Sequence, residues 1–187
     1  TGEEKYYAGV TRFALDILPA GKYSFKVKAV TESGKESAWS ESVAYEKQEV
    51  SPFEMKLINA NTEYEIKSVG IASGEVVIEN TYKGLPITSI GDKAFANSYV
   101  SSIKLGDNIK SIGNSAFKNC FKLTAITLNE GLTEIGDYAF QSCSSLEKIE
   151  MTETLLTLGE YAFSYCTALK SVELNGGCKK ISGNAFA

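Results

Sequence analysis

Residues 111–128, SIGNSAFKNCFKLTAITL, hold the motif that decides the fold of this chain, because close copies of it precede and follow. The first seven letters, SIGNSAF, have counterparts in SIGDKAF, EIGDYAF, TLGEYAF and KISGNAF. These copies end at Phe95, Phe117, Phe140, Phe163 and Phe186. Successive phenylalanines are 22, 23, 23 and 23 residues apart. A period this regular indicates a stack of equivalent supersecondary units.

Each unit contains a short stretch in which apolar and polar residues alternate, the pattern of a strand with one buried face. These stretches are Ile103–Leu105, Ile126–Leu128, Ile149–Met151 and Val172–Leu174. A turn and a second short extended piece follow, which ends at Ile112 in the quoted unit. Asp92, Asn114 and Asp137 stand just before Ala-Phe pairs, where a helix N-cap would lie. Each Phe of the motif is expected to fill the space between layers.

One unit cannot bury its own apolar face, whereas stacked units share a continuous core. The period therefore predicts a mainly β leucine-rich-repeat solenoid. The run Ser-Ile-Gly-Asp-x-Ala-Phe, then Cys, then Leu-x-x-Ile-x-Leu, resembles the BspA-type leucine-rich repeats of bacterial surface antigens. Residues 76–91, VVIENTYKGLPITSIG, resemble the stretch with which such arrays begin. The resemblance covers about residues 53–187. It implies a secreted or cell-surface protein used in adhesion or recognition, with no catalytic residues.

The array is expected to begin with a cap. Residues 53–90 are predicted as an N-terminal β cap, with a hairpin formed by Glu54–Leu57 and Tyr64–Val69 and a third strand at Val76–Ile78. Such a cap covers the apolar layers and unpaired strand edges that an open solenoid exposes. Residues 91–187 are predicted as the repeats, truncated at the C-terminus because no second cap follows the last Ala-Phe pair.

Residues 1–47 lack the repeat and are predicted as a separate antiparallel β segment, joined to the cap by a polar linker at residues 48–52. Alternating apolar residues near Phe13, from Tyr23 to Ala29 and near Val43 indicate three strands. The stretch from residue 18, LPAGKYSFKVKAVTESGKESAWSESV, resembles the last three strands of a fibronectin type III domain. The resemblance implies a partial fibronectin type III-like segment, about half of such a sandwich.

Composition excludes several function classes. The 187 residues include 19 basic and 23 acidic ones, a net charge of −4, and the sole arginine is Arg12, which argues against a nucleic-acid surface. There is no His, which excludes Ser-His-Asp and Cys-His catalysis as well as His metal sites. No apolar run approaches the roughly 18 residues of a membrane span. We therefore expect a chain without enzyme activity, metal, cofactor or membrane span.

The cysteines and two of the glutamates each leave two interpretations open. Cys120, Cys143 and Cys166 recur once per unit, and Cys178 occupies a different position. Free buried thiols are favoured over disulfides, because side chains of stacked strands point in parallel and a bridge needs Cβ atoms about 3.8 Å apart. Glu150 and Glu173 are expected on neighbouring strands, where they could mimic a general-acid pair, but two solvated surface acids are the favoured interpretation.

The outward positions of the ladder strands form the predicted ligand-facing stripe. It comprises Ser102, Lys104, Ala125, Thr127, Lys148, Glu150, Ser171 and Glu173. Tyr138 and Tyr161, just before two Ala-Phe pairs, are candidate flank aromatics. Four strands spaced about 4.8 Å apart offer a face of only a few hundred square ångströms, against roughly 800 Å² per partner in a stable interface. Binding by this stretch alone is expected to be weak and to gain from avidity in longer arrays.

Together these patterns predict a non-catalytic recognition or adhesion module, extracellular or at the cell surface. The solenoid face would bind host or matrix proteins, neighbouring cells or glycans. Two alternatives stay open: a purely structural spacer in a larger surface protein, and an accessory piece of a glycan-processing enzyme. An uncapped C-terminal end could also form dimer contacts, because it exposes apolar layers.

Overall fold

The computed structural model describes residues 21–31, 33–47, 53–69, 72–174 and 176–187. The chain divides into two compact units, Thr1–Val50 and Ser51–Ala187. In the first unit, β1 (Gly21–Phe25) and β2 (Val43–Lys47) pair in antiparallel fashion. The further strand predicted near Phe13 lies outside the described residues.

The described part of the first unit is a two-stranded ribbon with a long connection. The strand predicted from Tyr23 to Ala29 ends at Phe25, and a single bridge pairs Val30 with Glu36. Trp39 is half exposed, with the Lys28 ammonium 4.8 Å from the centre of its ring. These residues show antiparallel β structure, and they do not by themselves show a fibronectin type III domain.

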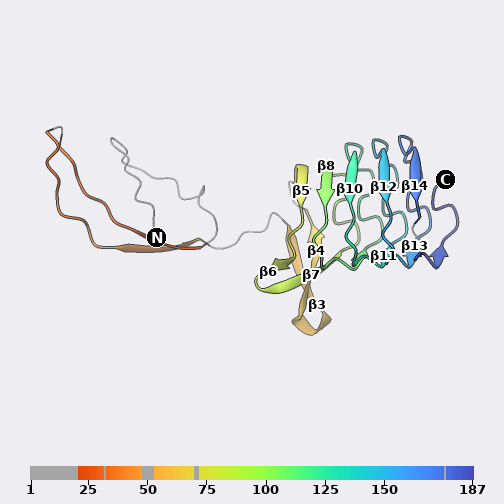
Figure 1. The fold of residues 1–187 in the computed structure, drawn as a ribbon, viewed down its shortest axis with the longest axis horizontal. Helices are drawn as coiled ribbons and strands as arrows, with labels where there is room; N and C mark the ends of the chain where they lie inside the picture. The colour runs from red at the N-terminus through yellow and green to blue at the C-terminus, as the bar shows by residue number, and fades with distance from the viewer. Residues whose placement is uncertain (1–20, 32, 48–52, 70–71, 175) are drawn as a thin grey trace. The chain divides into compact units, whose positions relative to one another are not determined.

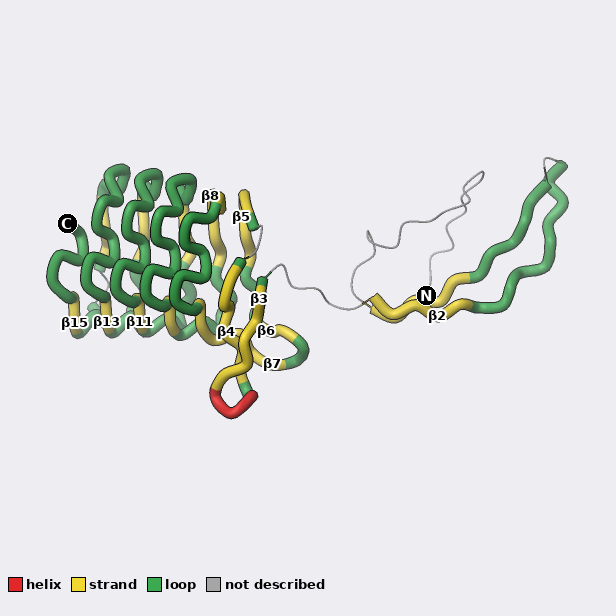
Figure 2. Tube along the Cα trace, turned by 180° about the vertical axis from the view of Figure 1, so that it is seen from behind, coloured by secondary structure: helices red, strands yellow, loops and turns green. Residues whose placement is uncertain are grey.

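The second unit begins with the predicted hairpin. β3 (Glu54–Ile58) and β4 (Glu63–Ser68) pair in antiparallel fashion across a tight turn, η1 (Asn59–Asn61). All three turn residues have positive φ, a conformation that Asn tolerates better than most residues. Figure 2 shows the hairpin projecting from one end of the solenoid. The first coil follows, with β5 (Ser73–Val77), β6 (Thr81–Tyr82) and β7 (Leu85–Ile90).

Four further coils each place one strand in each of two sheets (Figure 1). The strands are β8 (Tyr99–Lys104), β9 (Ser111–Ile112), β10 (Ala125–Thr127), β11 (Glu134–Ile135), β12 (Lys148–Glu150), β13 (Thr157–Leu158), β14 (Ser171–Glu173) and β15 (Lys180–Ile181). The first sheet has the order β14-β12-β10-β8-β5, and its strand pairs are parallel. The second runs β15-β13-β11-β9-β7-β4-β3, with β6 paired to β7. The predicted solenoid with an N-terminal β cap is confirmed.

The motif phenylalanines form a spine through the core. The rings of Phe95, Phe117, Phe140 and Phe163 are buried and stack on one another with centroids 4.8–5.0 Å apart. Phe53, just before β3, tilts against Phe95 at the N-terminal end, with the ring centroids 5.9 Å apart. These four motif rings fill the space between layers, as the repeat predicts, and a cap residue covers the end of the spine; the fifth, Phe186, stacks on Phe163 but is 42% exposed.

The third side of each coil is a turn face on which backbone groups bond from coil to coil. The amides of Phe95, Phe117 and Phe140 each donate to the carbonyl of the alanine one coil further on, at 2.7 Å. On this face, two positions in each of four coils and one position in the last coil adopt positive φ without being glycine. The first position directly precedes the Ala-Phe pair and is occupied by Lys93, Ser115, Tyr138, Tyr161 and Asn184. The second lies two residues after the Phe and is occupied by Asn97, Asn119, Ser142 and Tyr165. The bonds between coils offset the steric cost of this backbone shape.

Asp92, Asn114 and Asp137 do not cap helices, because the segment that follows each of them is a turn. Instead, Oδ1 of each accepts a hydrogen bond from the backbone amide of the equivalent residue in the next coil, at 2.7–2.8 Å. The neighbouring glycine must be small, because a Cβ at Gly113 would lie 2.6 Å from Asp92 Oδ1. The helix N-cap prediction is therefore wrong, and these residues form a row of hydrogen bonds that links successive coils.

Candidate ligand-binding face

The first sheet brings the predicted stripe together as two rows. Parallel pairing aligns Ser102 with Ala125, Ala125 with Lys148, and Lys148 with Ser171. It also aligns Lys104 with Thr127, and Glu150 with Glu173. All of these residues are exposed except Ser102, which is half-buried. We call this surface the ladder face.

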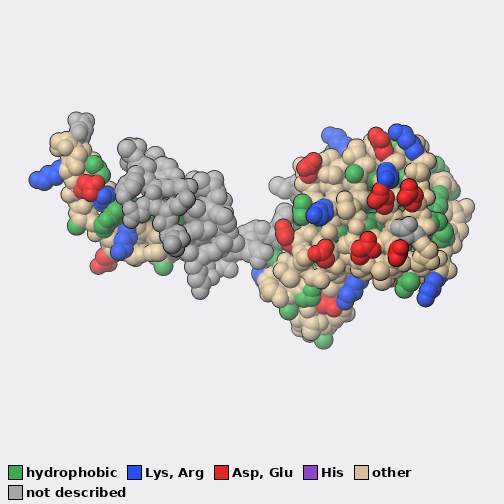
Figure 3. All heavy atoms as spheres, in the orientation of Figure 1, with side chains coloured by type: hydrophobic (Ala, Val, Ile, Leu, Met, Phe, Trp, Pro, Cys, Tyr) green, Lys and Arg blue, Asp and Glu red, His purple; other side chains and the backbone are tan. Residues whose placement is uncertain are grey.

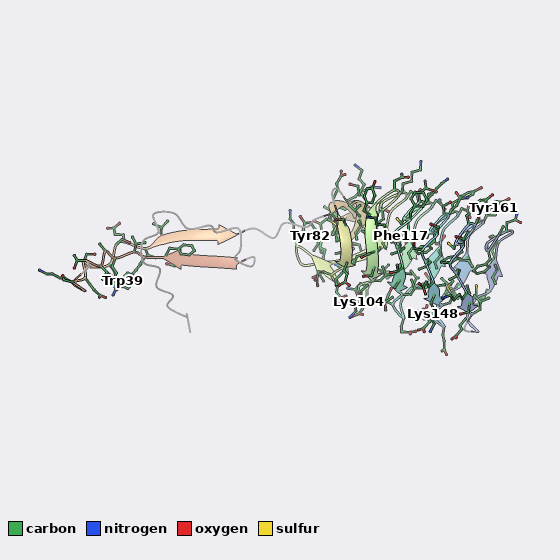
Figure 4. All side chains as sticks on the ribbon, turned by 90° about the horizontal axis from the view of Figure 1, so that it is seen from above. Trp39, Tyr82, Lys104, Phe117, Lys148 and Tyr161 are labelled. Carbon is green, nitrogen blue, oxygen red and sulfur yellow. The ribbon has the colours of Figure 1, made fainter. Side chains whose placement is uncertain are left out.

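The alternation of side chains along each strand produces the ladder face. Ile103, Ile126 and Ile149 point into the core, so their neighbours on both sides point outward. In Figure 4, Lys104 and Lys148 lie along one side of the solenoid, Tyr161 lies on the opposite side, and Phe117 lies between them. The flank tyrosines therefore belong to a different surface from the stripe.

Sequence reasoning missed three residues of this face. β5 pairs with β8 and aligns Glu75 with Ser102 and Val77 with Lys104, which extends both rows by one coil. Tyr99, the first residue of β8, is 68% exposed, with Lys122 Nζ 5.4 Å from its ring centre. The alternation that defines the stripe breaks in β8, where Val100 and Ile103 are both buried and the pairing with β5 shifts register, so it gave no signal for Tyr99. The ladder face therefore has an exposed aromatic side chain at its rim.

The charges on the ladder face largely compensate one another. Lys148 donates a hydrogen bond to Glu150 on the same strand, which raises the pKa of Lys148 and lowers the pKa of Glu150. Figure 3 shows acidic and basic side chains on the same side of the solenoid that Figure 1 presents. A surface of mixed charge suits a protein partner better than a polyanion.

The carboxyl pair considered as a general acid does not fit that role. Glu150 and Glu173 are neighbours in the parallel register, and both are exposed. A general acid at neutral pH needs a raised pKa, whereas Lys148 lowers that of Glu150. The arrangement matches two solvated surface acids.

The flank tyrosines pack on each other over the turn face. The rings of Tyr138 and Tyr161 are parallel within 7°, with centroids 5.3 Å apart. Lys118 Nζ lies 5.7 Å from the Tyr138 ring centre, and Asn184 donates a hydrogen bond to Tyr161 Oη at 3.0 Å. Neighbouring side chains thus occupy the ring faces and the Tyr161 hydroxyl, so this pair contributes to coil stacking.

The cysteines are free thiols. The Sγ of Cys120, Cys143 and Cys166 each donates to the carbonyl of a motif Phe one coil back, at 3.1 Å. Hydrogen bonding with Cys120 and Cys166, together with burial, raises the pKa of the Cys143 thiol. A thiol with a raised pKa is a poor nucleophile, so Cys143 acts as a small buried side chain.

Among the described residues, no group of three or more His, Cys, Asp or Glu side chains is arranged to hold a metal ion. Over the same part of the chain, no helix has the length and apolar character needed to cross a membrane.

Comparison with known proteins places the repeats in a family. Residues 88–187, more than half of the chain, match the model described as the BspA type leucine rich repeat region, in six copies. A search of curated proteins found no match. The matched family is a repeat family and not a catalytic one.

Solved structures share the fold. A leucine-rich repeat protein of T. pallidum, TpLRR, is 32% identical with a TM-score of 0.69, over 72% of this chain and 63% of that one. A leucine-rich repeat protein from Bacteroides capillosus ATCC 29799 is 26% identical with a TM-score of 0.62, over 69% of this chain and 98% of that one. A leucine rich cell surface protein from Faecalibacterium prausnitzii A2-165 is 24% identical with a TM-score of 0.53, over 74% and 45%. The chain thus spans less than two thirds of the T. pallidum protein.

Proposed function

The chain belongs to the BspA-type leucine-rich repeat family, and we propose that it is a recognition module that binds a protein ligand on the ladder face. One observation carries the proposal: two rows of side chains, exposed except for Ser102, run across five paired strands, with the exposed Tyr99 at their rim. Aromatic anchors surrounded by polar side chains are typical of protein interfaces.

The area of the face supports weak binding by one copy. Five strands about 4.8 Å apart, each with roughly 10–15 Å of exposed length, give a few hundred square ångströms. A stable interface buries about 800 Å² per partner, so affinity would come from several copies at one surface. We propose an extracellular or cell-surface location, in keeping with the Faecalibacterium relative, which is described as a cell surface protein.

Two further parts of the proposal concern the ends of the molecule. The first unit would serve as a partial fibronectin type III-like spacer, a proposal supported by its antiparallel ribbon and by the sequence of residues 18–43. The last coil would form weak dimer contacts, because Leu174, Ile181 and Phe186 are each between 42% and 47% exposed. Apolar clusters on an open strand edge promote association.

The test is binding of the chain, immobilised in many copies, to a panel of purified extracellular-matrix proteins and glycans. The matched variant exchanges the charges of one ion pair, Lys148→Glu with Glu150→Lys, which keeps the net charge and the pairing. A second variant, Tyr99→Ala, removes the aromatic side chain at the rim. We expect saturable binding of a protein ligand that both variants weaken.

The other outcomes separate the alternatives. Saturable binding of a glycan alone, weakened by the same variants, would keep the site and change the ligand class. Binding that both variants leave unchanged would exclude the ladder face. A folded chain that binds nothing in the panel would favour the structural spacer.

A further inference from the structure

A polar groove of about 720 Å³ lies beside the second sheet, away from the ladder face. The hairpin forms one wall, with Lys56, Glu65 and Lys67 among its lining side chains. The outward side of β7, β9 and β11 forms the floor. The volume lies within the range of known ligand sites, which is about 300–1,000 Å³.

The contacts between the hairpin and the first coils hold the groove open. Thr88 Oγ1 on β7 donates to Glu63 Oε2 at 2.7 Å, and Asn59 Nδ2 donates to the same oxygen at 2.6 Å. Lys110 Nζ lies 3.6 Å from Glu63 Oε1. One carboxylate therefore ties the hairpin to two coils, and the groove needs no rearrangement to form.

The charges that line the groove do not balance locally. Lys56 pairs with Glu65 at 3.5 Å, Lys110 pairs with Glu63, and Lys67 pairs with Glu54 at 2.8 Å. Asp92 and Glu134 also line the groove, and within the described chain neither has an ion-pair partner. The unpaired charge of the groove is negative and selects a cationic ligand.

The floor contains a polar group without a partner. Parallel pairing aligns Glu65, Ser89, Ser111 and Glu134 as the outward row of the second sheet, because Ile90, Ile112 and Ile135 point into the core. Ser89 is only 9% exposed, and its hydroxyl has no hydrogen-bond partner among the described residues. A buried hydroxyl without a partner is costly. The oxygen itself is covered, and a rotation of the Ser89 side chain toward the groove would let a ligand carbonyl or amide supply the missing bond.

We propose that the groove binds an extended segment of a partner protein that presents lysine or arginine side chains to Asp92 and Glu134. The site is open along one side, which suits a strand-like segment. None of its described lining side chains is aromatic, so it offers no ring on which a sugar could stack. Hydroxyl, amide and carboxylate groups on the floor match the amides and cations of a peptide.

The experiment selects peptides from a random dodecapeptide library displayed on phage, with the whole chain as target at low salt. Enriched sequences are synthesised, and their affinities are measured by fluorescence anisotropy. The groove variant combines Glu134→Lys with Asp92→Asn, which retains the Asp92 acceptor for the Asn114 amide. We expect lysine or arginine at a fixed place in the enriched peptides and about a tenfold or greater loss of affinity in the variant.

Two control variants distinguish this site from the ladder face and from a merely structural effect. The Lys148→Glu, Glu150→Lys exchange should leave peptide affinity unchanged, because it alters the other sheet. Ser89→Ala should weaken peptide binding without lowering the melting temperature of the free chain, since it removes a hydroxyl that has no partner. Peptide binding should also shift the amide NMR signals of Ser89 and Ser111.

Several outcomes would overturn the proposal that the groove binds a basic peptide. They are enriched peptides without basic residues, full affinity in the groove variant, and amide shifts confined to the first sheet, in β8, β10, β12 and β14. Loss of peptide binding in the charge exchange but not in the groove variant would assign the peptides to the ladder face. If the chain bound no matrix protein but the groove experiments gave the expected results, the ladder-face proposal would be rejected and the groove proposal would be retained.

Discussion

The stacked phenylalanines give each coil the same central contact. Phe117 and Phe140 are fully buried, and each has a stacked ring on both sides at about 5 Å, with interplanar angles between 6° and 29°. The Tyr138 and Tyr161 rings stack in the same manner, but both remain partly exposed on the turn face. The geometry of the two pairs is similar, so burial is what separates their contributions to stability.

Replacing Phe140 by Ala should lower the free energy of unfolding by about 3–5 kcal/mol, because it leaves a cavity in the middle of the spine. Replacing Tyr161 by Ala should cost about 1 kcal/mol, since it removes a half-exposed aromatic pair and one hydrogen bond. Urea unfolding of the two variants and the parent chain measures both values. Equal losses would contradict the assignment of Phe140 to the core and of Tyr161 to the flank.

For individual residues, the role of a side chain as hydrogen-bond acceptor was easier to predict than the identity of its donor. The sequence predicts Asp92, Asn114 and Asp137 as helix N-caps, which is wrong, although their side chains do accept hydrogen bonds from backbone amides. Their donors lie 22 or 23 residues away rather than two or three, because the coils stack with these positions one above another. A local capping rule considers only donors within the same turn. The stacking distance is a property of the assembled solenoid, so sequence spacing alone could not identify the donor.

Besides the pairing of β4 with β7, a titratable side chain, Glu63, ties the hairpin to the coils. Hydrogen bonds from Thr88 and Asn59, with a smaller contribution from Lys110, lower the pKa of Glu63 from its ordinary value of 4.5. Because the folded pKa lies below the unfolded one, the carboxylate contributes its full stabilisation above about pH 4.5. That stabilisation is lost as the pH falls through the lower folded value.

The variant Glu63→Gln should therefore be less stable than the parent chain at pH 7, because a neutral amide accepts weaker hydrogen bonds than a carboxylate. The difference in melting temperature should begin to shrink below about pH 4.5, where Glu63 becomes protonated in the unfolded chain, and should vanish once the pH is below the lower folded pKa. Circular dichroism melts between pH 7 and pH 3 measure it. In Thr88→Val, which removes the first donor, NMR titration should show a higher Glu63 pKa than in the parent. A constant difference across this range would show that Glu63 does not couple to folding.

The positions of the strands along the sequence were predicted within a few residues, whereas the register in which they pair was predicted less well. The third strand was expected at Val76–Ile78 and is found at Ser73–Val77. Its pairing with β8 includes a register shift, and the 22-residue first spacing gives no guide to such irregularities. For this reason Glu75, Val77 and Tyr99 were absent from the predicted stripe. The polar groove was also beyond prediction, since it depends on the position of the hairpin relative to three coils.

For the molecule as a whole, each coil of the solenoid touches its immediate neighbours, and the last coil has a neighbour on one side. Leu174, Ile181 and Phe186 are partly exposed there, and β14 and β15 are the edge strands of their sheets. Glu173 in β14 and Lys180 in β15 oppose pairing with another chain, so the exposed apolar side chains would support only a weak contact.

Self-association is expected to rise with concentration and to be measurable by sedimentation velocity. Ile181→Lys should reduce it, because a charge on the edge opposes pairing. The matched control is Val77→Lys, on the edge strand at the other end of the first sheet. Dimerisation that persists in Ile181→Lys, or that disappears in Val77→Lys alone, would contradict the proposed contact.

The global architecture followed from the 23-residue period, because every copy repeats the same buried pattern and five copies leave no competing fold. The first 50 residues provide no such repetition. Their apolar alternation predicted antiparallel strands, two of which lie within the described residues. Function was predictable only as a class, because packing in the core constrains the buried residues and leaves the exposed side chains, which would contact a ligand, free to vary.

The hydrogen bonds accepted by Asp92, Asn114 and Asp137 favour folding of the coils in order from the N-terminus. In each case the side chain of the earlier coil accepts from the backbone of the later one. During synthesis the ribosome releases the earlier coil first, so the acceptor is already in place when the later amide emerges. The chain can thus add one coil after another to a finished template, and no coil has to wait for the C-terminus before it folds.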